Sequence, residues 1–305
     1  MSSGNPPWYV QDENGAFLVL EVPPRLKNHP EIVRRGLQLE PAYPMKVGVV
    51  YRSSHLINPQ YVVKILDTDT EERDIYTRLL RDLRCPRNPA IPGELTPPEV
   101  DHPLLIMPAL QRSGMLSILD ASFYEMLGYC LQFMEGVEYL HDQHIVHLDL
   151  CTDNVVTASN VRPHPHPDVI PGKVYIIDFD SSRQLSLGPG AHPAIKLPPS
   201  QVPKPNGLEH LDPYSWDVYC AADVMREILR DSSPHQQEPL PIIARLYLAW
   251  LTGRERGCTE PCRCRPTARR ARQVLVVMRW LVGIQEMCQG ALRRATGMVQ
   301  YLLSS

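Results

Sequence analysis

The sequence predicts an α+β protein with a small, strand-rich N-terminal part and a larger, helical C-terminal part. Two observations carry this prediction: short apolar segments typical of strands gather before residue 108, and helical periodicity dominates after residue 115. The chain of 305 residues, 43% hydrophobic and 21% charged, is long enough to bury a sizeable core and has the composition of a globular protein.

Strands are expected first along the chain. Segments typical of strands lie near 17–22, 47–51, 61–66 and 104–107. A helix is expected over about 70–83, where Thr68 and Glu71 have the spacing of a capping box.

Helices dominate the C-terminal part. Apolar residues recur at i, i+3 and i+4 over 123–141, which predicts an amphipathic helix. Short strands are expected at 155–157 and 174–177. Asp212 and Pro213 make a good helix start, with the Asp as N-cap and the Pro in the first turn. Later helices are expected near 240–252 and 267–303.

Charge is spread unevenly along the chain. The formal net charge is −3, yet residues 251–305 hold ten Arg, no Lys and three Glu. A segment this basic can meet an acidic partner or RNA. A solvated helix face is the simpler interpretation, so no nucleic-acid partner is expected.

No targeting or membrane segment is predicted. The first ten residues lack the basic and apolar regions of a signal peptide, and no run of about 18 uncharged apolar residues is present. The eight cysteines stand mostly in helical or loop contexts, which suits a reducing compartment. An intracellular location, cytoplasmic or nuclear, is expected, with no membrane partner.

Three cysteines, Cys258, Cys262 and Cys264, lie close together in the sequence and offer metal-ligand chemistry. Zinc usually takes four ligands, and neither a second cysteine pair nor a nearby histidine accompanies these three. The sequence therefore favours reduced loop cysteines over a metal site.

The most informative stretch runs from His147 to Asn154 and reads HLDLCTDN. It directly follows the long predicted helix and precedes a predicted strand, so it is expected to be a short polar loop. It resembles the catalytic loop of protein kinases, H-R-D-L-x-x-x-N. The resemblance implies that Asp149 accepts the proton of a substrate hydroxyl and that Asn154 binds magnesium.

Two residues of the N-terminal part extend the resemblance. Lys64 shares a face of its predicted strand with apolar neighbours, which is costly unless an anion pairs with it. The segment YVVKIL at 61–66 resembles the V-A-I-K strand of kinases, whose Lys contacts the α- and β-phosphates of ATP. Glu72 stands where the kinase helix carries the Glu that pairs with this Lys.

Three further signatures follow in the expected order. Asp178, in DFD, resembles the D-F-G aspartate that binds magnesium, and Phe179 is then expected to pack near Tyr76. The DVY at 217–219 resembles the start of the kinase helix whose buried Asp holds the catalytic loop. The RPTA at 265–268 resembles a segment late in the helical lobe.

Together these motifs span about residues 40–280 and are typical of a divergent, fungal-type member of the protein kinase superfamily. The resemblance implies a two-lobed protein-kinase-like fold, with a small β-rich N-lobe and a larger α-helical C-lobe. The expected parts are an N-terminal extension (1–35), the N-lobe (36–107), a hinge (108–113) and a C-lobe that ends in a helix (114–305). The resemblance also implies ATP and magnesium as cofactors, and a protein substrate or binding partner.

The same resemblance places the nucleotide between the lobes. Gly48 would end a degenerate glycine-rich loop that covers the phosphates. Met107 would gate the rear of the adenine pocket, and Leu110 would belong to the hinge.

Several positions depart from the kinase pattern. Tyr43 and Met45 replace the first two loop glycines, Leu148 replaces the Arg of the catalytic loop, Cys151 replaces its Lys, and Asp180 replaces the Gly of D-F-G. One cation at ~4 Å from a phosphate is worth on the order of 4 kcal/mol at an effective dielectric of 20. Losing all of it slows transfer by about three decades. Asp180 either adds a metal ligand or repels ATP.

Three hypotheses follow. The first is an active Ser/Thr-type protein kinase that depends on ATP and magnesium. The second is a pseudokinase that binds nucleotide or partners with little or no turnover, as Cys151, Asp180 and the degenerate glycine-rich loop suggest. The third is a small-molecule phosphotransferase, which usually has Gly where this chain has Leu148.

Overall fold

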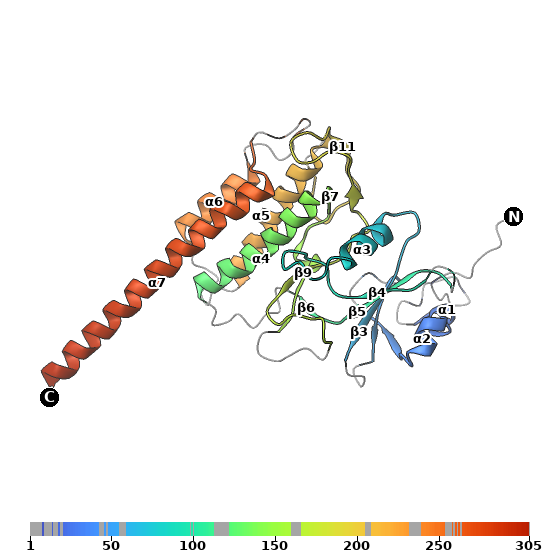
Figure 1. Cartoon of the computed structure of the whole chain (residues 1–305), viewed down its shortest axis with the longest axis horizontal. Helices are drawn as coiled ribbons and strands as arrows, with labels where there is room; N and C mark the ends of the chain where they lie inside the picture. The colour runs from blue at the N-terminus through green and yellow to red at the C-terminus, as the bar shows by residue number, and fades with distance from the viewer. Residues whose placement is uncertain are drawn as a thin grey trace. The chain divides into compact units, whose positions relative to one another are not determined.

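The computed structural model (Figure 1) describes residues 8, 14, 18, 21–42, 46, 48–54, 59–97, 99, 101–112, 122–159, 166–204, 209–231, 239–253, 258, 260, 262 and 264–304. Their contacts group the chain into two compact units, residues 1–112 with 154–184 and residues 113–153 with 185–305. The first unit is rich in strands and the second in helices. Half of the strand expected near 17–22 lies outside the described residues, and the described Leu18, Glu21 and Val22 are not in a strand.

A five-stranded antiparallel sheet is the frame of the strand-rich unit. Its strands follow the order β1-β2-β3-β5-β4, with the bounds β1 (Leu39–Pro41), β2 (Val50–Ser53), β3 (Tyr61–Ile65), β4 (Glu94–Leu95) and β5 (Leu104–Pro108). Lys64 lies opposite Val50 on β2 and Leu105 on β5. The pairing on both sides fixes the backbone of Lys64 in the centre of the sheet.

Among the described residues, this unit has three helices: α1 (Pro24–Lys27), α2 (Pro30–Arg34) and α3 (Glu72–Leu80). The capping box expected at Thr68 and Glu71 is wrong, because Glu71 is the N-cap and makes no side-chain cap hydrogen bond. The turn before α3 is organised by Asp67 instead. Its Oδ1 accepts the Asp69 N–H at 2.9 Å, and its carbonyl accepts the Thr70 hydroxyl at 3.0 Å.

A second, three-stranded sheet joins residues 154–184 to the strand-rich unit. Its order is β6-β8-β9, with the bounds β6 (Gln111–Arg112), β8 (Val155–Thr157) and β9 (Val174–Ile176), and β10 (Arg183–Gln184) follows later in the chain. The N–H of Ile176 bonds to the carbonyl of Pro89 at 2.8 Å. The predicted lobe boundaries, which are continuous in sequence, stay a prediction.

Four helices make up most of the helical unit where the structure describes it: α4 (Phe123–Asp142), α5 (Pro213–Asp231), α6 (Ile242–Thr252) and α7 (Ala268–Ser304). Their shorter companions are β7 (Ile145–Val146), the 3-10 turn η2 (Thr152–Asn154) at the border of the two units, and the paired strands β11 (Ile195–Lys196) and β12 (His210–Leu211). The four predicted helices are confirmed. Asp212 caps α5 as expected, because its Oδ1 accepts the N–H groups of Tyr214 at 3.0 Å and Ser215 at 3.2 Å.

The basic C-terminal segment forms α7, which lies along α4 and continues beyond it in Figure 1. Arg272 and Arg269 pair with Glu138 of α4, whose side chain is only 4% exposed. Part of the positive charge of this segment is therefore used inside the fold. Within the described residues, no helix combines the length and apolar character needed to cross a membrane.

Candidate functional site

Three charged residues that lie far apart in the sequence meet in the strand-rich unit. Nζ of Lys64 on β3 lies 2.6 Å from Oε1 of Glu72 on α3 and 2.5 Å from Oδ1 of Asp178, which follows β9. The three side chains are 5%, 0% and 11% exposed. Charges this buried must balance one another, because an unpaired one costs several kcal/mol.

Burial and pairing act in opposite directions on the pKa values of this cluster. Burial lowers the pKa of Lys64, but the Glu72 and Asp178 carboxylates outweigh it and hold that pKa above its usual value. Burial raises the pKa of Asp178, but the ammonium groups of Lys64 and Lys46 outweigh it and hold that pKa below its usual value. At Glu72 burial prevails over Lys64 and the pKa is raised. Lys64 and Asp178 are therefore both ionised at neutral pH.

A strained turn positions Asp178. Its φ of +71° lies in the left-handed region, which residues other than Gly rarely adopt. The next residue holds the turn in place: the Phe179 N–H donates to Oε1 of Glu72 at 3.0 Å, and the buried Phe179 ring lies 5.1 Å from the Tyr76 ring, edge to face. The predicted packing of Phe179 near Tyr76 is confirmed.

Asn154 lies next to the strand that leads to this turn. β8 pairs with β9 so that Val155 is opposite Ile176, and the carbonyl of Asn154 accepts the N–H of Ile177 at 3.0 Å. Asn154 is buried. The two predicted magnesium ligands, Asn154 and Asp178, therefore stand at adjoining ends of two paired strands.

Sequence reasoning missed Lys46 as a member of this site. Its ammonium group pairs with Oδ2 of Asp178 at 2.7 Å and also with Oδ2 of Asp180. Partial burial lowers the pKa of Lys46, but the two carboxylates outweigh it and hold that pKa above its usual value. The only sequence signal was a Lys two residues before Gly48, in a segment where a flexible glycine-rich loop was expected.

The carboxylates of Asp178 and Asp180 suit a hard cation. They converge on one cationic group, the Lys46 ammonium. Among the described residues, Oδ1 of Asp180 is buried and has no hydrogen-bond partner. Magnesium prefers carboxylate and amide oxygens, so these two residues together with Asn154 fit a magnesium ion.

In the helical unit, Asp217 on α5 holds the loop that contains Asp149. Its two carboxylate oxygens accept the backbone N–H groups of His147 and Leu148, each at 2.8 Å. Leu148 has a φ of +67°, and its carbonyl accepts the indole N–H of Trp216 at 3.3 Å. The predicted role of Asp217 as the holder of this loop is confirmed.

Asp149 itself is 6% exposed. Its Oδ1 accepts the backbone N–H of Gln201 at 2.7 Å. Sequence reasoning did not foresee this contact, because it joins two segments without regular secondary structure. The hydrogen bond fixes the orientation of the carboxylate within the helical unit.

The residues expected around the nucleotide occupy the sheet and the segments that flank it. Gly48 has a φ of +77°, and a Cβ there would meet no atom within 4 Å, so its backbone conformation rather than crowding favours glycine. Met107 is buried on β5 opposite Val62, and Leu110 lies just beyond that strand and is half-buried. The expected loop positions Tyr43 and Met45 lie outside the described residues.

These features define the protein-kinase class of fold: an antiparallel sheet whose Lys pairs with a helical Glu, and a helical lobe whose buried Asp holds a polar loop. The family model for protein tyrosine and serine/threonine kinases matches residues 48–189. A relative in Danio rerio, the striated muscle preferentially expressed protein kinase, is 28% identical over 134 residues. That alignment covers 41% of this chain and 4% of the relative, so the chain spans a small part of its length.

Both matches support a protein-kinase-like domain in this chain, and the two-lobed α+β fold is the one predicted from its sequence.

Proposed function

We propose that this protein binds ATP with magnesium and transfers the γ-phosphoryl group to a serine or threonine hydroxyl of a protein substrate. The observation that carries the proposal is the cluster of Lys64, Glu72 and Asp178. A buried Lys held by one carboxylate and directed at a second is suited to binding phosphate beside a metal. An intracellular location, cytoplasmic or nuclear, belongs to the same proposal.

Each residue has one task in the proposed reaction. Lys64, oriented by Glu72, binds the α- and β-phosphates. Asn154 and Asp178, with Asp180, hold magnesium, which when bound neutralises phosphate charge. Asp149 orients the substrate hydroxyl and takes its proton as the hydroxyl oxygen bonds to phosphorus and the nucleoside diphosphate leaves.

Three residues are proposed to contact the nucleotide outside this charged cluster. Gly48 allows the backbone before β2 to approach the phosphates. Met107 bounds the rear of the adenine pocket, and Leu110 lies in the segment whose backbone meets the adenine edge. The neighbouring Ala109 N–H bonds to the carbonyl of Gln60 at 2.9 Å, which supports a fixed backbone at this place.

A pseudokinase is the second candidate function, and one contact favours it. The Lys46 ammonium pairs with Asp178 and Asp180, the carboxylates that a kinase needs for magnesium. A cation built into the chain reduces the gain from binding a metal there. The loss of the loop Lys at Cys151 also reduces charge neutralisation in the transition state. Such a protein binds nucleotide or a partner without turnover.

One preparation measured in two ways tests both candidates. A thermal shift with magnesium and ATP reports binding, and transfer of labelled phosphate to a generic protein acceptor or to the chain itself reports catalysis. The active kinase is expected to show both, with transfer abolished in Asp149→Asn while the thermal shift remains. A clear thermal shift without transfer that depends on Asp149 would instead establish the pseudokinase.

The missing cation gives a second, internal test. Cys151→Lys is expected to raise the transfer rate by at least tenfold, because it restores positive charge near the γ-phosphate. Cys288→Lys on α7 is a matched control, since Cys288 is exposed and lies outside the site. Equal rates in both variants would show that charge at position 151 does not limit the reaction.

A further inference from the structure

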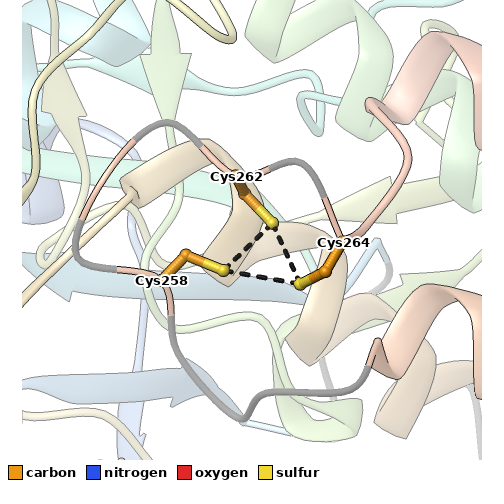
Figure 2. Close-up of side chains that lie close together, drawn as sticks. All are labelled: Cys258, Cys262 and Cys264. Atoms are coloured by element: carbon orange, nitrogen blue, oxygen red, sulfur yellow. Dashed lines mark hydrogen bonds between the residues drawn. The ribbon is translucent and has the colours of Figure 1, made fainter.

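Three thiols converge in the helical unit, and none of them is assigned to phosphoryl transfer. Sγ of Cys258 lies 3.1 Å from Sγ of Cys262 and 3.5 Å from Sγ of Cys264, and the latter two are 3.4 Å apart. Figure 2 shows the three side chains pointing to a common centre. In the described part of the chain this is the one group of three or more His, Cys, Asp and Glu side chains close enough to share a metal ion.

Two hydrogen bonds to Asp212 anchor the backbone that carries these thiols. The Asp212 N–H donates to the carbonyl of Cys258 at 2.7 Å, and Oδ2 of Asp212 accepts the N–H of Cys262 at 2.8 Å. The other oxygen of the same carboxylate caps α5. A ligand set held by hydrogen bonds to a helix start is organised before any metal arrives.

A buried cation lies against the cluster. Nη1 of Arg265 is 3.7 Å from Sγ of Cys258 and donates to Oγ of Ser215 at 2.9 Å, while Nε donates to the carbonyl of Thr252 at 2.8 Å. Arg265 is 6% exposed. A guanidinium in this position stabilises negative charge on the sulfur atoms, and thiolates rather than thiols bind metals.

We propose that Cys258, Cys262 and Cys264 bind one Zn²⁺ ion as three thiolates, with a solvent molecule as the fourth ligand. At the usual Zn–S distance of about 2.3 Å, the ion sits roughly 1.3 Å above the plane of the three sulfur atoms. That position leaves one tetrahedral site open on the side away from the sulfurs. A divalent ion with three thiolates carries a net charge of −1, which the adjacent Arg265 offsets.

A disulfide accounts for the geometry less well than a metal. The third sulfur is almost equally near to both partners of any pair, so a disulfide would leave one thiol in the cluster unused. From the sequence, zinc was unfavourable because no second pair of ligands accompanies the three cysteines. The structure favours zinc because the three sulfur atoms converge and a solvent molecule can take the fourth position.

The proposed role of the ion is to clamp the start of α5. Asp212, which binds the cysteine segment, lies five residues before Asp217, which holds the backbone of His147 and Leu148. Zinc bound by the three thiolates would hold this segment against Asp212, so its loss should loosen the α5 start and, through it, the loop around Asp149. This inference does not depend on whether the protein transfers phosphate.

Zinc content of the full chain, purified under reducing conditions and dialysed against trace zinc, tests the site. The wild type and Cys288→Ser are expected to retain one zinc per chain by mass spectrometry of the metal, because Cys288 is exposed and outside the cluster. Cys262→Ser and Cys264→Ser are expected to lose it. One zinc per chain in these two variants would overturn the assignment, as would a wild type that binds only Cu(I).

A measurement on the wild type covers the case in which the variants do not fold. X-ray absorption at the zinc edge is expected to show three sulfur neighbours at about 2.3 Å and one oxygen or nitrogen. A coordination shell without sulfur would overturn the proposal, as would thiol counting that finds a Cys258–Cys262 disulfide surviving the reducing conditions of purification. Chelation of the zinc should also speed hydrogen exchange at the His147 and Leu148 amides; unchanged exchange there would overturn the clamping role.

Discussion

The Nζ atom of Lys46 lies 2.7 Å from Oδ2 of Asp178, whose other oxygen pairs with Lys64. One carboxylate therefore holds two ammonium groups, from the segment before β2 and from the middle of β3. The first of these occupies an oxygen that a kinase offers to magnesium. This contact makes the balance between the internal cation and the metal the central question about the site.

Removing the internal cation should favour the metal. We expect Lys46→Met to raise the affinity for magnesium in the presence of ADP by roughly two- to fivefold, the effect of losing about 0.5–1 kcal/mol from a partly exposed ion pair. A magnesium titration followed by thermal shift measures it. Lys46→Arg keeps the charge and should behave as the wild type. A lower affinity in Lys46→Met would mean that Lys46 binds phosphate rather than competing with the metal.

The Lys64 cluster should dominate the stability of the strand-rich unit. Lys64→Met leaves Glu72 and Asp178 as buried carboxylates without their shared cation, so the free energy of unfolding should fall by about 3–5 kcal/mol. Urea denaturation measures this loss. The double variant Lys64→Met with Glu72→Gln removes one buried charge and should recover part of the loss. If the double variant is less stable than the single one, repulsion between the carboxylates is not the cause.

Acid should weaken the same cluster in a defined direction. The pKa of Asp178 is lowered from its ordinary value of 3.8 in the folded chain, so the unfolded chain binds the proton first as the pH falls. The stability that Asp178 contributes is therefore complete above the unfolded pKa of 3.8 and is lost as the pH falls through the lower, folded pKa.

Urea denaturation of the wild type and Asp178→Asn at a series of pH values checks this. The difference in unfolding free energy between the two proteins should be constant from pH 7 to about 5 and shrink below about pH 4. A difference that grows on acidification would show that the folded pKa of Asp178 is raised instead.

The sequence was sufficient for residues whose positions follow from strand, helix and loop order. Lys64, Glu72 and Asp178 stand at a strand, a helix start and a strand end, and the kinase resemblance was enough to expect them together. The contacts of Lys46 and Gln201, and the convergence of the thiols, join irregular segments. Their geometry depends on backbone torsions in turns, for which the sequence carries no periodic signal. The cap expected at Thr68 failed for a related reason, because a turn organised by Asp67 comes first and α3 begins only at Glu72.

The hydrogen bonds of Asp217 should control the order of the loop that carries Asp149. Asp217 is 1% exposed and accepts two backbone N–H groups, and Nε2 of His141 lies 3.1 Å from its Oδ2. In Asp217→Asn the amide oxygen can accept only one of the two backbone N–H groups. The amide NH₂ group then faces the other N–H, which is also a donor. The unfolding free energy should fall by about 2–3 kcal/mol, the scale of hydrogen bonds to a buried charged group.

Hydrogen exchange should also become at least tenfold faster at the His147 and Leu148 amides, because both lose an ionised acceptor. Asp223→Asn is the matched control: Asp223 lies on the same helix, is 34% exposed and pairs with Arg226, so its loss should cost less than about 0.5 kcal/mol and leave the loop amides unchanged. Equal exchange in the two variants would mean that Trp216 and the packing of Leu148 suffice to hold the loop. In that case the left-handed conformation of Leu148 would be maintained by side-chain burial and not by the carboxylate beneath it.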